Sequence, residues 1–238
     1  MFKEAISNYI DRLCNQQQLQ VPCGWDGFRC VLFDMDGVLY NSMPRHAVAW
    51  QEAMKKYGIH FTTEDSYATE GMRGIDTIRI FVKRQLGKEI SEAEAQSMYD
   101  EKTRLFHQMQ QIKQAGMDIC VVTGSGQRPL IQRLVQDFGE FIDEQHIVSA
   151  YNISRGKPAP DPYMKGLEMA GGYHPWQAIV VENAPLGVRS GVAAGCFTIA
   201  VNSGPLPDSA LADEGANIVL PSIVELDRHW QDIISYRP

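Results

Sequence analysis

The chain has 238 residues, of which 44% are hydrophobic and 21% charged, and its formal net charge is −7. These values are typical of a globular protein with one large domain, or with a core and a small second domain. The negative charge argues against a general nucleic-acid binder and against attraction to anionic membranes, so any site for an anionic substrate must supply its own positive charge.

The five cysteines show no paired spacing of the zinc-binding kind. We expect reduced, mostly buried thiols in a cytoplasmic protein. The N-terminal residues lack the basic start and long apolar run of a signal peptide, and no segment has the length and hydrophobicity of a membrane span. No membrane association is therefore expected.

The first two elements lie before Asp34. Residues 1–24 begin as an amphipathic helix and continue as a polar, Gln-rich stretch, which predicts an N-terminal helical extension packed on a surface. The apolar run Cys30–Phe33 follows and stops abruptly at Asp34. A continuous apolar run with β-branched and aromatic residues is typical of a buried strand.

A long helical segment comes directly after this strand. Apolar residues recur at three- and four-residue steps from Pro44 until Gly58, which predicts a helix with an apolar stripe of Ala47, Trp50, Met54 and Tyr57. Further helices are predicted near 75–86 and 92–115. Because no strand pattern lies between Asp34 and Met117, we expect a helical cap over residues 43–109.

The second half alternates short apolar strands with helices. Strands are predicted at 119–122, 147–148, 178–181, 197–201 and 218–220, and helices at 129–138, 161–170 and from Pro185 onward. This alternation predicts a parallel sheet covered on both faces. The expected fold is therefore α/β, with a Rossmann-like parallel-sheet core formed by residues 25–42 and 110–238 and interrupted by the helical cap.

Polar residues follow the strands of this core, where parallel α/β sheets place their ligands. The first strand leads to Asp34 and Asp36, the second to Thr123-Gly124-Ser125, the loop after the third to Lys157, and the fourth to Glu182-Asn183. Carboxylate and amide oxygens suit Mg²⁺, while a hydroxyl, backbone N–H groups and an ammonium suit phosphoryl oxygens. The set favours phosphoryl transfer, in which one carboxylate attacks phosphorus.

Asp34-Met35-Asp36-Gly37-Val38-Leu39 resembles the first signature of the haloacid dehalogenase superfamily. Thr123, Lys157 and Glu182-Asn183 are similar to its second, third and fourth signatures, in the same order along the chain. The resemblance covers roughly residues 30–220 and is nearest to β-phosphoglucomutase and the related sugar-phosphate phosphatases. Four ordered motifs at strand ends make it specific, whereas a lone Asp-x-Asp-Gly also occurs in turns and calcium loops.

The resemblance implies a role for each of these residues. It makes Asp34 the nucleophile and a Mg²⁺ ligand, and Asp36 the general acid/base, whose backbone carbonyl also binds the metal. It assigns phosphate binding to Thr123, Gly124, Ser125 and Lys157, and further metal binding to Glu182 and Asn183. The cap then closes over the site and selects the substrate.

Two features depart from the mutase pattern. The fourth signature there is Glu-Asp, whereas this chain has Glu182-Asn183, so we expect weaker metal binding without loss of function. The connection after Met109 is also shorter than in relatives, by about a dozen residues. Either this sequence is a shortened version, or one helix serves both as cap exit and as crossover into the core.

Three cap residues bear on the substrate. His46 has the spacing from Asp36 of a hinge histidine in the mutase, although a plain helix-surface position is as good an interpretation. Glu70 stands where the mutase has a lysine in its specificity loop, and the neighbouring Arg73 could bind a second phosphate. A mutase needs two anion sites, so Glu70 favours a phosphatase while His46 favours a mutase.

We therefore expect Mg²⁺-dependent hydrolysis of a small phosphorylated sugar or polyol through a phospho-Asp34 intermediate. The alternative within the same chemistry is a β-phosphoglucomutase that interconverts β-glucose 1-phosphate and glucose 6-phosphate. A more distant alternative is a non-catalytic, ligand-sensing protein of the same fold. The expected partner is a small phosphorylated metabolite, without nucleic acid or membrane, and the expected state is a monomer or weak homodimer.

Overall fold

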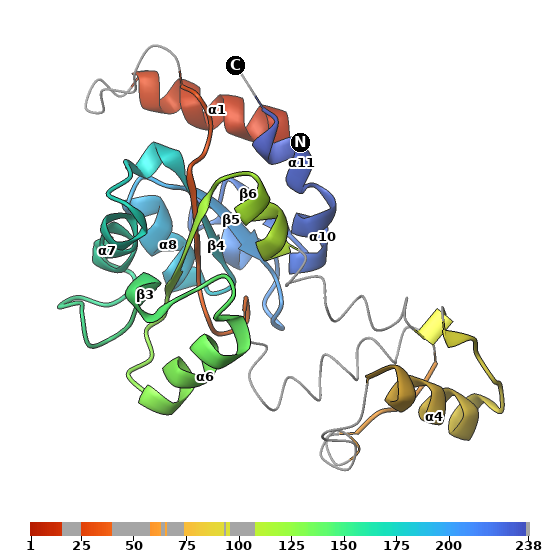
Figure 1. Ribbon diagram of the computed structural model, residues 1–238. Coiled ribbons are helices and arrows are strands. Elements are labelled where there is room, and N and C mark those ends of the chain that lie inside the picture. The colour runs from red at the N-terminus through yellow and green to blue at the C-terminus, as the bar shows by residue number, and fades with distance from the viewer. Residues whose placement is uncertain are drawn as a thin grey trace. The chain divides into compact units, whose positions relative to one another are not determined.

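The computed structural model describes residues 1–15, 25–39, 58–62, 65, 74–92, 94–95 and 108–236 (Figure 1). The chain divides into two compact units, one of residues 1–39 with 108–238 and the other of residues 40–107. Met109, which we assigned to the cap from sequence, belongs to the first unit. Residues 108–114 are helical there, and both Met109 and Ile112 are fully buried.

A six-stranded parallel sheet in the order β3-β2-β1-β4-β5-β6 forms the centre of the first unit. The strands are β1 (Cys30–Phe33), β2 (Asp118–Val122), β3 (Ile147–Val148), β4 (Ala178–Glu182), β5 (Phe197–Val201) and β6 (Ile218–Leu220). Every residue of β1, β4 and β5 is buried. Strands covered on both faces are continuous apolar runs, and this is why all six were predictable from sequence.

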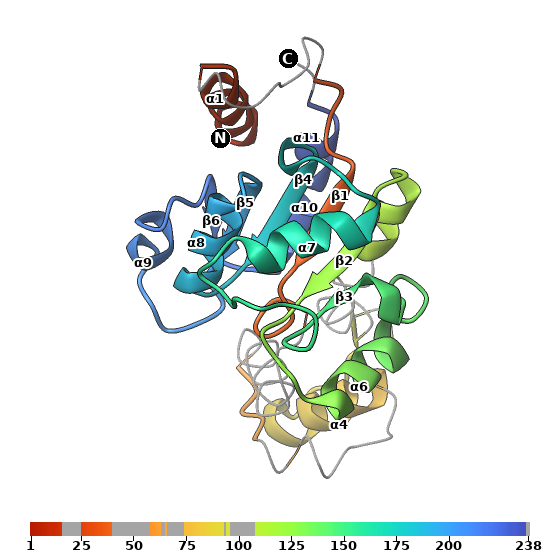
Figure 2. The ribbon, with the colours of Figure 1, turned by 90° about the vertical axis from the view of Figure 1, so that its left-hand side faces the viewer.

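Helices cover both faces of this sheet and the side on which its strands begin. They are α1 (Phe2–Asn15), α6 (Arg128–Phe138), α7 (Asp161–Ala170), α8 (Pro185–Ala193), α9 (Ser209–Ala212), α10 (Ile223–Arg228) and α11 (Trp230–Ile234), with 3₁₀ turns at Glu144–His146 and Pro175–Gln177. Figure 2 shows α7 across one face of the strands and α10 behind them. The fold is thus the expected Rossmann-like α/β core.

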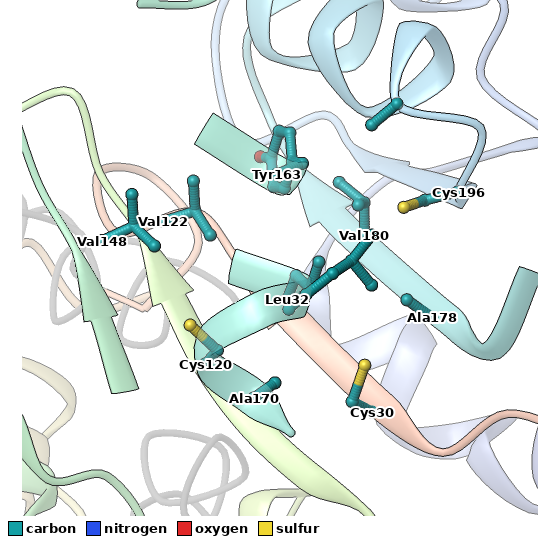
Figure 3. Packing of buried hydrophobic residues seen from close by; sticks show 12 residues of the cluster. Cys30, Leu32, Cys120, Val122, Val148, Tyr163, Ala170, Ala178, Val180 and Cys196 are labelled. Carbon is teal, nitrogen blue, oxygen red and sulfur yellow. The ribbon is translucent and has the colours of Figure 1, made fainter. Parts of the chain in front are cut away.

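One apolar cluster lies between α7 and the strands β1, β2 and β4. Figure 3 shows Leu32, Cys120 and Val180 of the sheet converging on Tyr163 and Ala170 of α7. A Cβ on Gly166 would stand 2.9 Å from a methyl carbon of Val122, so α7 packs closely on the sheet because this position lacks a side chain. This packing holds Tyr163, and with it the start of α7, directly under the strand ends.

Helix α1 is packed on the same unit as the sheet. Its buried face consists of Phe2, Ile6, Tyr9, Ile10 and Leu13. The Tyr9 hydroxyl donates to the carbonyl of Gly195, just before β5, at 2.6 Å. Figures 1 and 2 show α1 beside α11, on the side of the sheet where the strands begin. The helix therefore stabilises the core from the edge opposite the carboxyl ends of the strands.

The described part of the second unit is built around α4 (Gly74–Leu86). A small apolar cluster contains Ile59, Phe61, Ile78, Phe81, Val82 and Ala95. The helix predicted near 75–86 is confirmed. The predicted stripe from Ala47 to Tyr57, together with His46, Glu70 and Arg73, lies outside the described residues. Within the described parts of the chain, no helix is long and apolar enough to cross a membrane.

Candidate active site

The carboxyl ends of the neighbouring strands β2, β1 and β4 bring the predicted core residues to one edge of the sheet. Asp34 directly follows β1, and its backbone N–H donates to the carbonyl of Val181 in β4 at 2.9 Å. Thr123 follows β2, and its backbone N–H donates to the carbonyl of Val148 in β3 at 2.9 Å. Glu182 is the last residue of β4. These backbone bonds extend the sheet pattern by one residue and so position the side chains.

Lys157 connects the ends of all three of these strands. Its Nζ donates to Asp34 Oδ1 at 2.5 Å, to Glu182 Oε1 at 2.6 Å and to the carbonyl of Val122 at 3.0 Å. An ammonium group has three N–H donors, and all three are used. The side chains of Lys157, Asp34 and Glu182 are 14%, 11% and 1% exposed, so this is a buried ionic cluster.

The cluster contains two carboxylates and one ammonium, which leaves it short of positive charge. Burial is the largest cause that raises the pKa of Asp34, the charge of Glu182 adds to it, and Lys157 only partly opposes them, so that the pKa reaches about 7. Burial alone would lower the pKa of Lys157, but the charges of Glu182 and Asp34 raise it. A site of this kind favours the binding of a further cation.

Glu182 is held in one orientation by hydrogen bonds on both carboxylate oxygens. Besides Lys157, Oε1 accepts from the Tyr163 hydroxyl at 3.1 Å, while Oε2 accepts from the backbone N–H groups of Asn183 and Ala184 at 2.7 and 2.8 Å. Burial raises the pKa of Tyr163 well above its ordinary value, so its hydroxyl stays a donor. Glycine at position 187 is required because a Cβ there would stand 1.7 Å from Oε1.

Asn183 reaches back over the loop that follows β1. Its Nδ2 donates to Ser203 Oγ at 3.1 Å, and the Ser203 hydroxyl donates to the carbonyl of Gly37 at 2.8 Å. Gly37 has φ +88°, a conformation that favours glycine. The ends of β1, β4 and β5 are thus joined by one chain of hydrogen bonds that contains Asn183 and Ser203.

The loop after β2 offers hydrogen-bond donors. Thr123 is 1% exposed, and its Oγ1 accepts from the N–H of Ser125 at 3.0 Å, which leaves its own hydroxyl proton available. Among the described residues, the N–H groups of Gly124 and Gly126 have no acceptor. Such a turn with free N–H groups suits an anion. The loop thus fits phosphoryl oxygens.

Tyr151 holds this loop from the outside. Its hydroxyl donates to the carbonyl of Gly126 in a short hydrogen bond, and the Arg128 guanidinium lies 5.7 Å from the centre of its ring. The N–H of Ala150 also donates to the carbonyl of Ser125, at 3.2 Å. The segment after β3 therefore fixes the shape of the donor loop after β2.

The remaining predicted site residues are placed as follows. Asp36 is exposed beside the cluster, where its charge contributes to raising the pKa of Asp34. His46, Glu70 and Arg73 fall outside the described residues, so their predicted roles stay predictions. In the described part of the chain, no three His, Cys, Asp or Glu side chains gather as a metal site. The carboxylate of Asp34, the carbonyl of Asp36 and the amide of Asn183 remain the predicted metal ligands, and oxygen donors of these types suit Mg²⁺.

Like Tyr151, the residues Tyr163 and Ser203 of this arrangement were not singled out from sequence. Tyr163 lies inside α7 and looks like an ordinary core aromatic, so no local pattern marks its bond to Glu182. Ser203 lies just beyond β5, and extending the strand-end argument to the fifth strand would have included it.

Comparisons with known proteins show the family to which the chain is similar. Residues 31–201 match the family model described as haloacid dehalogenase-like hydrolase. The chain is 33% identical over 190 residues to hexitol phosphatase A of Escherichia coli K12, covering 72% of this chain and 82% of that protein. It is 24% identical over 197 residues to β-phosphoglucomutase of Bacillus subtilis, covering 74% and 84%. A solved structure of a candidate β-phosphoglucomutase from Bacteroides vulgatus is 39% identical, with a TM-score of 0.63 and coverage of 98% and 97%.

Proposed function

The chain belongs to the haloacid dehalogenase-like hydrolase family, and on this premise we propose that it hydrolyses a small phosphorylated sugar or polyol through a phospho-Asp34 intermediate. The observation that carries the proposal is the buried cluster in which Lys157 holds Asp34 at 2.5 Å beside Glu182. A fixed carboxylate next to a loop with free donors is what attack on phosphorus requires.

In the first half-reaction, a carboxylate oxygen of Asp34 attacks phosphorus. The bond from phosphorus to the leaving oxygen breaks, and Asp36 gives its proton to that oxygen. The donors of Thr123 and Gly124, together with the charge of Lys157, neutralise the phosphoryl oxygens. In the second half-reaction, Asp36 takes a proton from water, which attacks phospho-Asp34 and releases phosphate.

Mg²⁺ belongs to this proposal. The donor set consists of Asp34, the backbone carbonyl of Asp36 and the amide oxygen of Asn183. Glu182 adds its charge, although its oxygens already accept four hydrogen bonds. The shortage of positive charge around Asp34 supports the fit. When bound, Mg²⁺ would keep Asp34 ionised and offset the charge of the phosphoryl group.

Two further parts of the proposal are the location and the assembly. Cys30, Cys120 and Cys196 are buried free thiols, which suits a reducing, cytoplasmic compartment. We propose a monomer or weak homodimer whose partner is a small phosphorylated metabolite.

The second candidate is a β-phosphoglucomutase, in which a sugar hydroxyl replaces water in the second half-reaction. The similarity to proteins described in this way, from Bacillus subtilis and Bacteroides vulgatus, favours it. Glu70, at the position of the mutase lysine, opposes it. We expect Glu70→Lys to raise mutase turnover relative to phosphate release, and an unchanged product ratio would remove this argument.

One assay separates the candidates. The metal-stripped protein is incubated with added Mg²⁺ and a panel of hexitol, hexose and glycerol phosphates, and phosphate release is measured. β-Glucose 1-phosphate with a trace of its bisphosphate is included, since glucose 6-phosphate as product identifies a mutase. Release of free phosphate that is abolished by EDTA supports the phosphatase. No turnover across the panel would contradict both and favour a ligand-sensing protein.

A further inference from the structure

Ser203 follows β5 and belongs to none of the four family signatures, yet it contacts two of the loops that carry them. Its Oγ lies 2.8 Å from the carbonyl oxygen of Gly37 and 3.1 Å from Asn183 Nδ2. A serine hydroxyl has one proton, whereas a carbonyl oxygen can only accept a hydrogen bond. The Ser203 proton must therefore be the one directed at Gly37.

This assignment leaves Ser203 as an acceptor towards Asn183. The amide must then present its NH₂ group to Ser203, because the opposite orientation would bring two oxygen lone pairs together. The amide oxygen Oδ1 faces away from Ser203. It has no hydrogen-bond donor among the described residues, so it is free to bind a cation.

We propose that Ser203 is a positioning residue, whose hydroxyl fixes the amide of Asn183 so that its oxygen, and not its NH₂ group, is offered to Mg²⁺. This inference rests on the proposed function, since it concerns the proposed Mg²⁺ site. An amide needs such a partner because its two ends differ chemically. A carboxylate does not, because either of its oxygens can bind a metal.

The same reasoning explains why Asn183 and Ser203 match each other. An aspartate in place of Asn183 would have no N–H to give to Ser203. The hydroxyl would then have to turn towards the carboxylate and leave the carbonyl of Gly37 without its donor. The amide and the hydroxyl thus form a matched pair, and exchanging one changes what the other contributes.

A double-mutant cycle tests the proposal by metal affinity, without any enzyme assay. Metal-stripped wild type, Ser203→Ala, Asn183→Asp and the double variant are titrated with Mn²⁺ by EPR, and Mg²⁺ affinity is obtained by competition. We expect Ser203→Ala to weaken Mg²⁺ binding about tenfold, the size seen when the partner of a metal ligand is removed. In the Asn183→Asp background, the same substitution should change the affinity less than about twofold, because a carboxylate needs no orientation.

Two controls accompany the cycle. Ser203→Thr keeps the hydroxyl and should bind Mg²⁺ within about twofold of wild type. Ser209→Ala, at an exposed position on α9, should leave the affinity unchanged. Circular dichroism and thermal unfolding of each variant confirm that the fold is intact.

The proposal is overturned if Ser203→Ala binds Mg²⁺ as tightly as wild type, if the loss is equal in the Asn183→Asp background, or if Ser203→Thr loses as much as Ser203→Ala. Any of these results leaves the proposed function standing as long as wild type releases phosphate with Mg²⁺. If wild type binds neither Mg²⁺ nor Mn²⁺, the proposed cofactor and this inference both fail.

Discussion

The side chain of Asn183 lies directly against Gly37: a Cβ at that glycine would stand 1.9 Å from Asn183 Nδ2. The two residues belong to the first and fourth motifs and lie at the ends of the neighbouring strands β1 and β4. The absence of a side chain at position 37 is therefore a condition for the amide to reach over the loop that carries Asp34 and Asp36.

Gly37→Ala should weaken Mg²⁺ binding as well as lower the stability of the fold. The new methyl group must displace Asn183 or the loop, so we expect Mg²⁺ affinity to fall by about tenfold or more. The left-handed backbone at φ +88° adds a stability loss of about 1–2 kcal/mol. Gly116→Ala is the matched control, because Gly116 has φ +71° but no neighbouring atom within 4 Å of the place that a Cβ would take. Equal Mg²⁺ affinity of the two variants would contradict the contact argument.

Asp34→Asn should abolish turnover and yet stabilise the metal-free protein at high pH. With its pKa raised from 3.8 to about 7, folded Asp34 holds a proton between these values that the unfolded chain releases. The free energy of unfolding of wild type therefore falls as the pH rises through this window. Thermal unfolding with EDTA at pH 5 and pH 8 checks this. The stability of the variant relative to wild type should be higher at pH 8 than at pH 5. A constant difference between the two proteins would argue against a raised pKa.

Lys157→Met should destabilise the metal-free protein strongly at pH 8, by about 3–5 kcal/mol, because two buried carboxylates lose their ammonium. The loss should be smaller at pH 5, where Asp34 takes up a proton. The raised pKa of Lys157 means that its stabilising contribution is present below its unfolded pKa of 10.5 and is lost as the pH rises above the folded value. Urea unfolding of the variant and of wild type at pH 5 and pH 8 measures the loss in free energy of unfolding.

Lys165→Met serves as the control for Lys157→Met. Lys165 pairs at 2.8 Å with Glu168, whose side chain is 69% exposed, on the surface of α7. A pair of this kind contributes at most about 1 kcal/mol, with little dependence on pH between 5 and 8. If both variants lost the same stability, the buried cluster would not have the charge imbalance described above.

Tyr163→Phe removes one hydrogen bond from Glu182, and Tyr9→Phe removes one from the carbonyl of Gly195. Both tyrosines are buried, so each variant should lose about 1 kcal/mol of stability. Only Tyr163→Phe should also lower kcat, by about two- to tenfold, because Glu182 helps to hold Lys157 and Asp34. Steady-state kinetics compare the two variants, and an equal kcat for both would make Tyr163 a purely structural residue.

Much of the core could be predicted from local sequence. The strands Cys30–Phe33, Ile147–Val148, Phe197–Val201 and Ile218–Leu220 have the predicted bounds. The short C-terminal helices α10 and α11 were not predicted, because five or six residues give too little periodicity for a clear pattern. Their contacts with α1 and β6 stabilise them in the folded chain.

The sequence by itself determined which residues stand at the strand ends, because a parallel strand buried on both faces is a continuous apolar run that stops where the chemistry begins. It thereby placed Asp34, Thr123 and Glu182 at one edge of the sheet. Only the tertiary structure decided how they are held: the three bonds of Lys157, the hydroxyl of Tyr163 under Glu182, and Ser203 beside Asn183. These contacts join residues far apart in the chain, and their strength depends on burial, which no local pattern of residues specifies.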